Sequence, residues 1–138
     1  MSALSFWHHH IGLSVPDLDE SIAWYETMLD FTLFRRSHIA DIPADIAMLK
    51  NGNMHIELLC VEGANPLPED RRTPELDIHT HGTKHGCFET DDVVATAEEL
   101  KRRGAEVLWV REYAGGRQNC FVRDNAGNLI EFVRAVPN

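Results

Sequence analysis

Two histidine–glutamate pairs recur at nearly the same spacing in the two halves of the 138-residue chain. His10 precedes Glu57 by 47 residues. His85 precedes Glu131 by 46 residues. Each His opens an apolar, strand-like stretch, and each Glu lies inside a later hydrophobic run. Two imidazoles and two carboxylates at equivalent positions of related halves form a ligand set for one divalent metal ion, with coordination positions left for water or substrate.

The composition favours one globular domain that binds a small molecule in the cytoplasm. A hydrophobic content of 43% is enough to build a sizeable core. The net charge of −9 and the lack of a Lys/Arg cluster argue against nucleic acid as a partner. Three cysteines without paired spacing indicate a reducing compartment. We expect neither a secretory signal nor a membrane span, which needs roughly 18 apolar residues.

A repeated order of elements divides this single domain (1–138) into two modules, predicted at 5–61 and 83–135, with a linker at 62–82. The first module is expected to contain a strand at 6–15, a helix from Asp17 to about Asp30, and strands at 31–36, 46–50 and 54–60. The second is expected to contain a strand at 83–89, a helix capped by 90–92 and ended by 103–104, and strands at 107–112, 119–123 and 129–134. The period of about 75 residues predicts an α+β fold of two tandem β-α-β-β-β modules.

Strand alternation supports the choice of the four ligands. The neighbours of both glutamates in the chain are apolar, so they should face a helix layer while the carboxylates face the opposite, concave side. A carboxylate buried there without a partner would be costly, which favours metal binding.

The duplicated unit resembles the vicinal oxygen chelate superfamily, which includes glyoxalase I, methylmalonyl-CoA epimerase, extradiol dioxygenases and bleomycin-resistance proteins. The resemblance covers nearly the whole chain, and its most specific segments are 10–19 (HIGLSVPDLD) and 123–132 (RDNAGNLIEF). It implies curved, mixed half-barrel sheets around a metal cavity. The positions that match the metal ligands of this family are His10, Glu57, His85 and Glu131. This set is similar to that of glyoxalase I.

The resemblance implies a metal-dependent isomerase or lyase that transfers a proton next to a metal-bound carbonyl through an enediolate. Glu131 would be the principal base, and both Glu57 and Glu131 would be ligands and proton carriers. The metal would be Ni, Co, Zn, Mn or Fe, and the substrate a small molecule with a carbonyl or vicinal oxygens. Ser14 and Val61 stand where glyoxalase I carries an Arg and an Asn toward glutathione, so glutathione is not predicted.

Two alternative functions and two arrangements of the site stay open. His10, His85 and Glu131 alone form the 2-His-1-carboxylate triad of a non-haem Fe(II) extradiol-type dioxygenase, although Glu57 would occupy a position that the substrates of such an enzyme need. A metal-free small-molecule binding or resistance protein is the other alternative. We expect a homodimer, as is common among relatives of this length, with the site either within one chain or shared between two.

Further polar residues fall near the predicted ligands. The candidates for a position beside the metal ligands or the substrate are His8, His55, Ser14 and Arg117. We expect His9 to point away from the site and Cys87 to be a small core residue.

Overall fold

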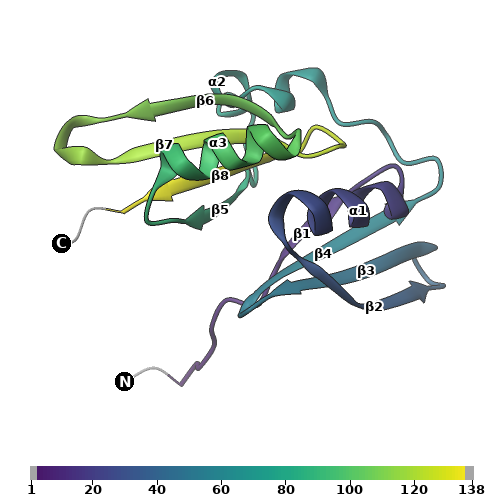
Figure 1. Cartoon of the computed structure of the whole chain (residues 1–138). Helices are drawn as coiled ribbons and strands as arrows, with labels where there is room; N and C mark the ends of the chain where they lie inside the picture. Colours follow the sequence, from purple (N-terminus) through teal and green to yellow (C-terminus); the bar gives the residue numbers. More distant parts are fainter. Residues whose placement is uncertain (1–2, 136–138) are drawn as a thin grey trace.

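The computed structural model describes residues 3–135 and contains the two predicted modules (Figure 1). The first consists of β1 (Ile11–Ser14), α1 (Leu18–Leu29), β2 (Thr32–Ile39), β3 (Ala44–Asn51) and β4 (Met54–Val61). Its sheet has the order β1-β4-β3-β2, with β1 parallel to β4 and the other pairs antiparallel. Asp17 caps α1 by accepting a hydrogen bond from the backbone of Glu20, and Asp30 ends the helix in a left-handed conformation.

The second module repeats this topology. It consists of β5 (Gly86–Glu89), α3 (Val93–Arg103), β6 (Glu106–Glu112), the short η2 (Ala114–Gly116), β7 (Gln118–Arg123) and β8 (Leu129–Arg134). Its sheet has the order β5-β8-β7-β6, with β5 parallel to β8. Asp92 caps α3, and Gly104 ends it with a φ of 99°. The predicted α+β class and the two β-α-β-β-β modules are therefore confirmed, with the two mixed sheets remaining open.

The first strand of each module is shorter than predicted. Ile11 pairs with Ile56, so by the same register residues 6–8 would face the turn 51–53 instead of a strand. Gly86 pairs with Ile130, which in the same way places residues 83 and 84 opposite the turn before β8. The residues at the predicted strand starts therefore have no parallel strand opposite them, and each ladder begins just inside its partner strand.

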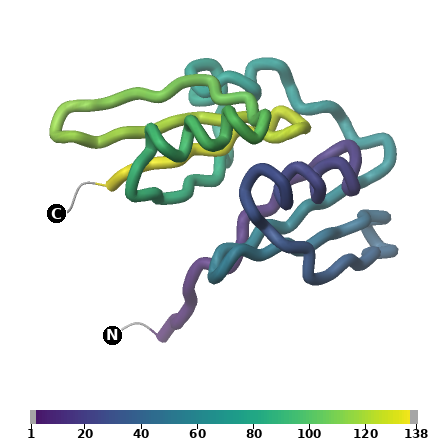
Figure 2. The backbone as a smooth tube through the Cα atoms, viewed as in Figure 1, coloured from purple at the N-terminus to yellow at the C-terminus, as the bar shows by residue number. Residues whose placement is uncertain are grey.

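The segment predicted as a plain linker contains two short helices, η1 (Glu69–Arg72) and α2 (Pro74–Asp77). It runs from the end of β4 across to β5 (Figure 2). Asp77 is only 1% exposed, and its Oδ1 lies 3.0 Å from Arg71 Nε and 3.2 Å from Lys84 Nζ. This buried ion-pair cluster ties the helical segment to the start of module two, an arrangement that the composition of the segment did not predict.

The modules share one core, formed by the helix-bearing face of each sheet. α1 contacts α3, and apolar side chains from both modules belong to the same buried cluster (Figure 1). Tyr25 on α1 is fully buried and donates a hydrogen bond of 2.8 Å to Asp124 Oδ2 in the β7–β8 turn. On the edge of the interface, Arg103 reaches from α3 to Asp30 at 2.8 Å. No helix within residues 3–135 is long and apolar enough to cross a membrane.

Candidate metal centre

The first pair lies on the face of module one that points away from the shared core. Ile56 and Leu58 are completely buried on the helix side of β4, so Glu57 between them faces the opposite side. Glu57 Oε1 lies 3.7 Å from His10 Nε2, and both side chains are partly exposed. Gly12 is the register partner of Glu57, and a Cβ at Gly12 would approach Glu57 Oε1 to 3.7 Å. The absence of a side chain at Gly12 leaves the carboxylate accessible.

Two further histidines lie beside this pair. His9 stacks on His55 with 5.1 Å between ring centroids, and its Nδ1 is 2.7 Å from Nδ1 of His10. The expectation that His9 points away from the site is therefore wrong, because this residue precedes β1 and strand alternation does not apply to it. His55 also meets Phe34 edge-on at 5.9 Å. Three imidazoles thus gather on the carboxylate face of module one.

The second pair lies on the equivalent face of module two. His85 Nε2 is 3.2 Å from Glu131 Oε1. The Asn119 side-chain amide donates a 2.8 Å hydrogen bond to Glu131 Oε2, while Phe121 meets the His85 ring edge-on at 4.8 Å. The amide of Asn119 therefore fixes one carboxylate oxygen of Glu131. The other oxygen faces the imidazole of His85. Ile130 and Phe132 fill the helix side of the strand, as alternation predicts.

Asn119 was not recognised from the sequence. It is 9% exposed, and within residues 3–135 its Oδ1 is buried without a hydrogen-bond partner. Strand alternation places it on the same face as Glu131, but an isolated Asn in an apolar strand carries no motif that would identify it. Its amide holds the carboxylate in place.

We expected Cys87 to be a small core residue, but it is exposed. Partial burial and the neighbouring charge of Glu131 raise the pKa of the Cys87 thiol to about 12. The thiol is therefore protonated near pH 7, which disfavours it as a nucleophile.

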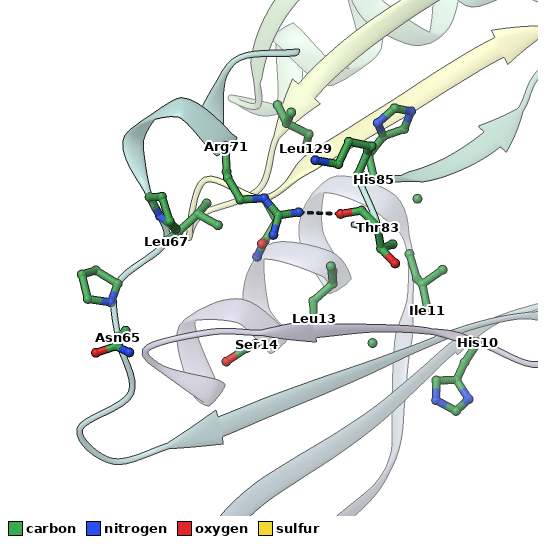
Figure 3. A pocket seen from close by; sticks show the side chains of 16 residues that line it. His10, Ile11, Leu13, Ser14, Asn65, Leu67, Arg71, Thr83, His85 and Leu129 are labelled. Atoms are coloured by element: carbon green, nitrogen blue, oxygen red, sulfur yellow. Dashed lines mark hydrogen bonds between the residues drawn. The ribbon is translucent and has the colours of Figure 1, made fainter. Parts of the chain in front are cut away.

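A cleft of about 740 Å³ separates the edges of the two modules (Figure 3). His10 and His85 both line it, with His85 on its upper side and His10 on its lower side in this view. Between them Arg71 donates a hydrogen bond to the Thr83 carbonyl. A Cβ at Gly86 would clash with Ile11 Cδ1, so β1 and β5 approach each other closely at the cleft that both residues line.

The four predicted ligands thus form two separate pairs within one chain. In the part of the chain that the structure describes, no group of three or more His, Cys, Asp or Glu side chains could hold a metal ion. Each pair nevertheless offers one imidazole and one carboxylate on a partly exposed face, which fits half of a coordination shell for a divalent ion.

The remaining candidates occupy different places. Ser14 lines the cleft between the modules, on the same strand as Gly12. Arg117 lines a second cavity, together with Glu131. His8 is exposed, and among residues 3–135 no hydrogen bond or ring contact joins it to either pair.

Comparisons with known proteins agree with the fold. Residues 9–121 match the family described as the Glyoxalase/Bleomycin resistance protein/Dioxygenase superfamily. The chain is 30% identical over 132 residues to a lactoylglutathione lyase of Haemophilus influenzae, covering 90% of this chain and 89% of the relative. It is 29% identical over 107 residues to an ethylmalonyl-CoA/methylmalonyl-CoA epimerase of Cereibacter sphaeroides, covering 72% of each.

Solved structures show the same architecture. A glyoxalase family protein from Enterococcus faecalis superposes with a TM-score of 0.78 at 20% identity, covering 93% of this chain and 97% of the other. A glyoxalase I variant from Zea mays superposes with a TM-score of 0.69 at 25% identity, covering 94% of this chain and 44% of that longer one. With the match over residues 9–121, these likenesses establish that the chain belongs to the Glyoxalase/Bleomycin resistance protein/Dioxygenase superfamily.

Proposed function

We propose that the protein is a metal-dependent isomerase or lyase whose four ligands come from two chains of a homodimer. The observation that carries this proposal is the pair of matched half-sites, each with one imidazole and one carboxylate, on faces directed away from the shared core. His10 and Glu57 of one chain would meet His85 and Glu131 of the other. The helix faces already pack within one chain, so the carboxylate faces are the ones left free for a second copy.

The exposed N-terminal segment supports a partner on this side of module one. Phe6 and Trp7, which directly precede the histidines, are 82% and 81% exposed. Two adjacent large aromatic side chains in water favour burial against another surface. A second chain that covers His10 would also cover this segment.

The side chains of the proposed site match proton transfer next to a carbonyl. A divalent ion (Ni, Co, Zn, Mn or Fe) held by the four side chains would supply Lewis-acid polarisation of a substrate carbonyl. Glu131 is the proposed base, because the Asn119 amide occupies its Oε2 and leaves Oε1 able to take a proton from the adjacent carbon. Glu57 would carry the proton on the opposite side of the substrate.

The relatives are consistent with this reaction class. Those matched over most of their length are named an epimerase and a lyase, and an isomerase or lyase reaction is in keeping with both names. The three free thiols are in keeping with a cytoplasmic location. We do not propose glutathione as a substrate component, because Ser14 and Val61 lack the cationic and amide groups that would contact it.

Metal analysis combined with deuterium exchange tests the proposal. We expect about one divalent ion per chain in the purified protein, and exchange of the proton next to the carbonyl in a screen of α-hydroxy carbonyls and acyl-CoA thioesters. Glu131→Gln should abolish exchange in the metal-replete protein, whereas Glu98→Gln, at an exposed site on α3, should not. Wild-type exchange by Glu131→Gln would contradict its role as base. Oxygen consumption with Fe(II) and catechols would favour the dioxygenase instead, and wild-type protein that binds no metal would favour the metal-free binding protein.

A further inference from the structure

The two ring nitrogens of His10 face two different side chains. Nε2 lies 3.7 Å from Glu57 Oε1, on the side of the proposed metal site. Nδ1 lies 2.7 Å from Nδ1 of His9, which is within hydrogen-bond distance. The planes of these two rings are nearly perpendicular, at 84°, with 5.0 Å between their centroids. One nitrogen of His10 therefore points toward the carboxylate, and the other is engaged by a second imidazole.

His9 is held in place by a side chain of β4. His55 stacks on His9 with 5.1 Å between ring centroids and 10° between ring planes. His55 lies two residues before Glu57, on the same face of β4, and pairs with Lys50 of β3. Phe34 of β2 meets the His55 ring edge-on at 5.9 Å. The sheet thus orients His9 through ring contacts, although His9 itself precedes β1.

A hydrogen bond between two neutral imidazoles needs a proton on one of the two facing nitrogens and a lone pair on the other. If His9 donates, the proton of His10 stays on Nε2 of a partly exposed ring, where Glu57 is beyond hydrogen-bond distance. If His10 donates, the remaining proton is on Nε2 of His9, a residue exposed to water that can accept it. The second arrangement satisfies both N–H groups and leaves a free lone pair on Nε2 of His10. A metal ion binds neutral imidazole only through such an unprotonated nitrogen.

We propose that His9 is a positioning residue that accepts the Nδ1–H of His10 and so keeps Nε2 of His10 unprotonated and directed toward the metal. Histidine ligands of metal ions commonly donate their second N–H to a fixed acceptor, and loss of that acceptor lowers metal affinity. The acceptor here is a neutral imidazole, so it adds no negative charge to a site in which Glu57 and Glu131 already supply two. The role toward the metal rests on the proposed function, whereas the hydrogen bond and the position of its proton do not.

Nitrogen-15 NMR of the metal-free protein tests the position of the proton. The ring nitrogens are observed through their couplings to the ring C–H groups at about pH 8.5, where free histidine side chains are neutral. We expect His10 to be protonated at Nδ1 and His9 at Nε2. His9→Phe keeps a ring that can stack on His55 but has no acceptor, so His10 should lose its preference for the Nδ1 proton, while the spectrum of His85 in the other module stays the same. A wild-type His10 protonated at Nε2, or a His10 spectrum that His9→Phe does not change, would overturn the proposal.

Competition with a chelator for Zn measures the effect on metal binding. His9→Phe should weaken binding about tenfold to a hundredfold. His9→Asn should bind close to the wild type, because its Oδ1 replaces Nδ1 as acceptor. The control His38→Phe removes another exposed imidazole, which is hydrogen-bonded to Asp45, and should leave the affinity unchanged. All three variants should keep the wild-type melting temperature, because the replaced side chains are exposed. Wild-type affinity of His9→Phe, or equal weakening by His9→Asn and His9→Phe, would rule out His9 as the acceptor that positions His10.

The two measurements separate this proposal from the proposed function. If the wild-type protein binds no metal but the proton of His10 is on Nδ1 and depends on His9, only the proposed function fails. If the wild-type protein binds metal but the position of this proton does not depend on His9, only the present proposal fails.

Discussion

A site shared between chains can be tested by mixing two inactive variants. One chain carries His10→Ala with Glu57→Gln and lacks the first half-site. The other carries His85→Ala with Glu131→Gln and lacks the second. In the proposed homodimer, each variant alone would have sites that keep only two of the four ligands. We expect both to lose metal binding and exchange activity, because each pair supplies one imidazole and one carboxylate of the set.

The expected recovery on mixing follows from the distribution of ligands over the modules. Random reassociation of equal amounts gives roughly half heterodimers, and each heterodimer has one site with all four ligands and one with none. The mixture should therefore regain about one quarter of the wild-type metal capacity and activity. This recovery requires exchange of subunits between the two variants. It should be absent when the two folded proteins are mixed under conditions in which subunits do not exchange.

Equilibrium dialysis against Ni or Co, followed by the exchange assay, measures this fraction. The variants are combined during refolding from denaturant, and each variant refolded with itself serves as the control. A mixture that binds no more metal than the separate variants would refute the shared site, since ligands confined to one chain cannot complement each other. Wild-type metal binding by either variant alone would show that its two substituted residues are not ligands.

Three further predictions concern residues that support the fold and the site. Asp77→Ala should lower the free energy of unfolding, measured in urea, by about 3 kcal/mol. This is the lower end of the range for breaking a buried ion pair, because both cations beside Asp77 stay partly exposed. An unchanged denaturation midpoint would contradict this prediction. Burial and the charge of Asp124 raise the pKa of Tyr25 well above 10.0, so above about pH 10 only the unfolded chain loses this proton and stability falls by up to about 1.4 kcal/mol per pH unit. Tyr25→Phe should remove that contribution to the alkaline slope, measured by thermal melts between pH 9 and 11, and an identical slope would argue against it. Asn119→Leu should weaken metal binding about tenfold to a hundredfold in a chelator competition, because Glu131 loses the donor at Oε2; equal affinity would mean that the amide does not position the carboxylate.

The local structure of the modules could be predicted from the sequence because it depends on neighbouring residues. Asp17 and Asp92 accept hydrogen bonds from N–H groups three residues later, which is the chemistry that makes Asp a favoured helix start. Gly52 between β3 and β4 has a φ of 58°, as the Asn-Gly-Asn turn predicts. Alternation also places Glu57 and Glu131 on the faces opposite the buried strand residues.

The arrangement of the modules could not be predicted in the same way. The periodicity of each helix predicts an apolar stripe but not the surface that it packs against. The contacts that decide this, such as Tyr25 with Asp124 and Arg103 with Asp30, join residues far apart in the chain. The residues at which β1 and β5 begin also depend on their pairing with β4 and β8, which is a property of the assembled sheet.

The position of the shared core explains why the proposed site would couple metal binding to dimer formation. Within one chain, the shared apolar core lies on the helix faces, and the two carboxylates stay partly exposed on the opposite faces. The two pairs lie on separate sheets, and within residues 3–135 no group of three or more His, Cys, Asp or Glu side chains could hold a common ion. A second chain that supplies the complementary half-site would therefore bind more tightly when metal is present. By linkage, the dimer would bind metal more tightly than the single chain does, and the two affinities would rise by the same factor. Dilution below the dimer dissociation constant should then release the metal, while the fold of each chain, which depends on its own core, persists.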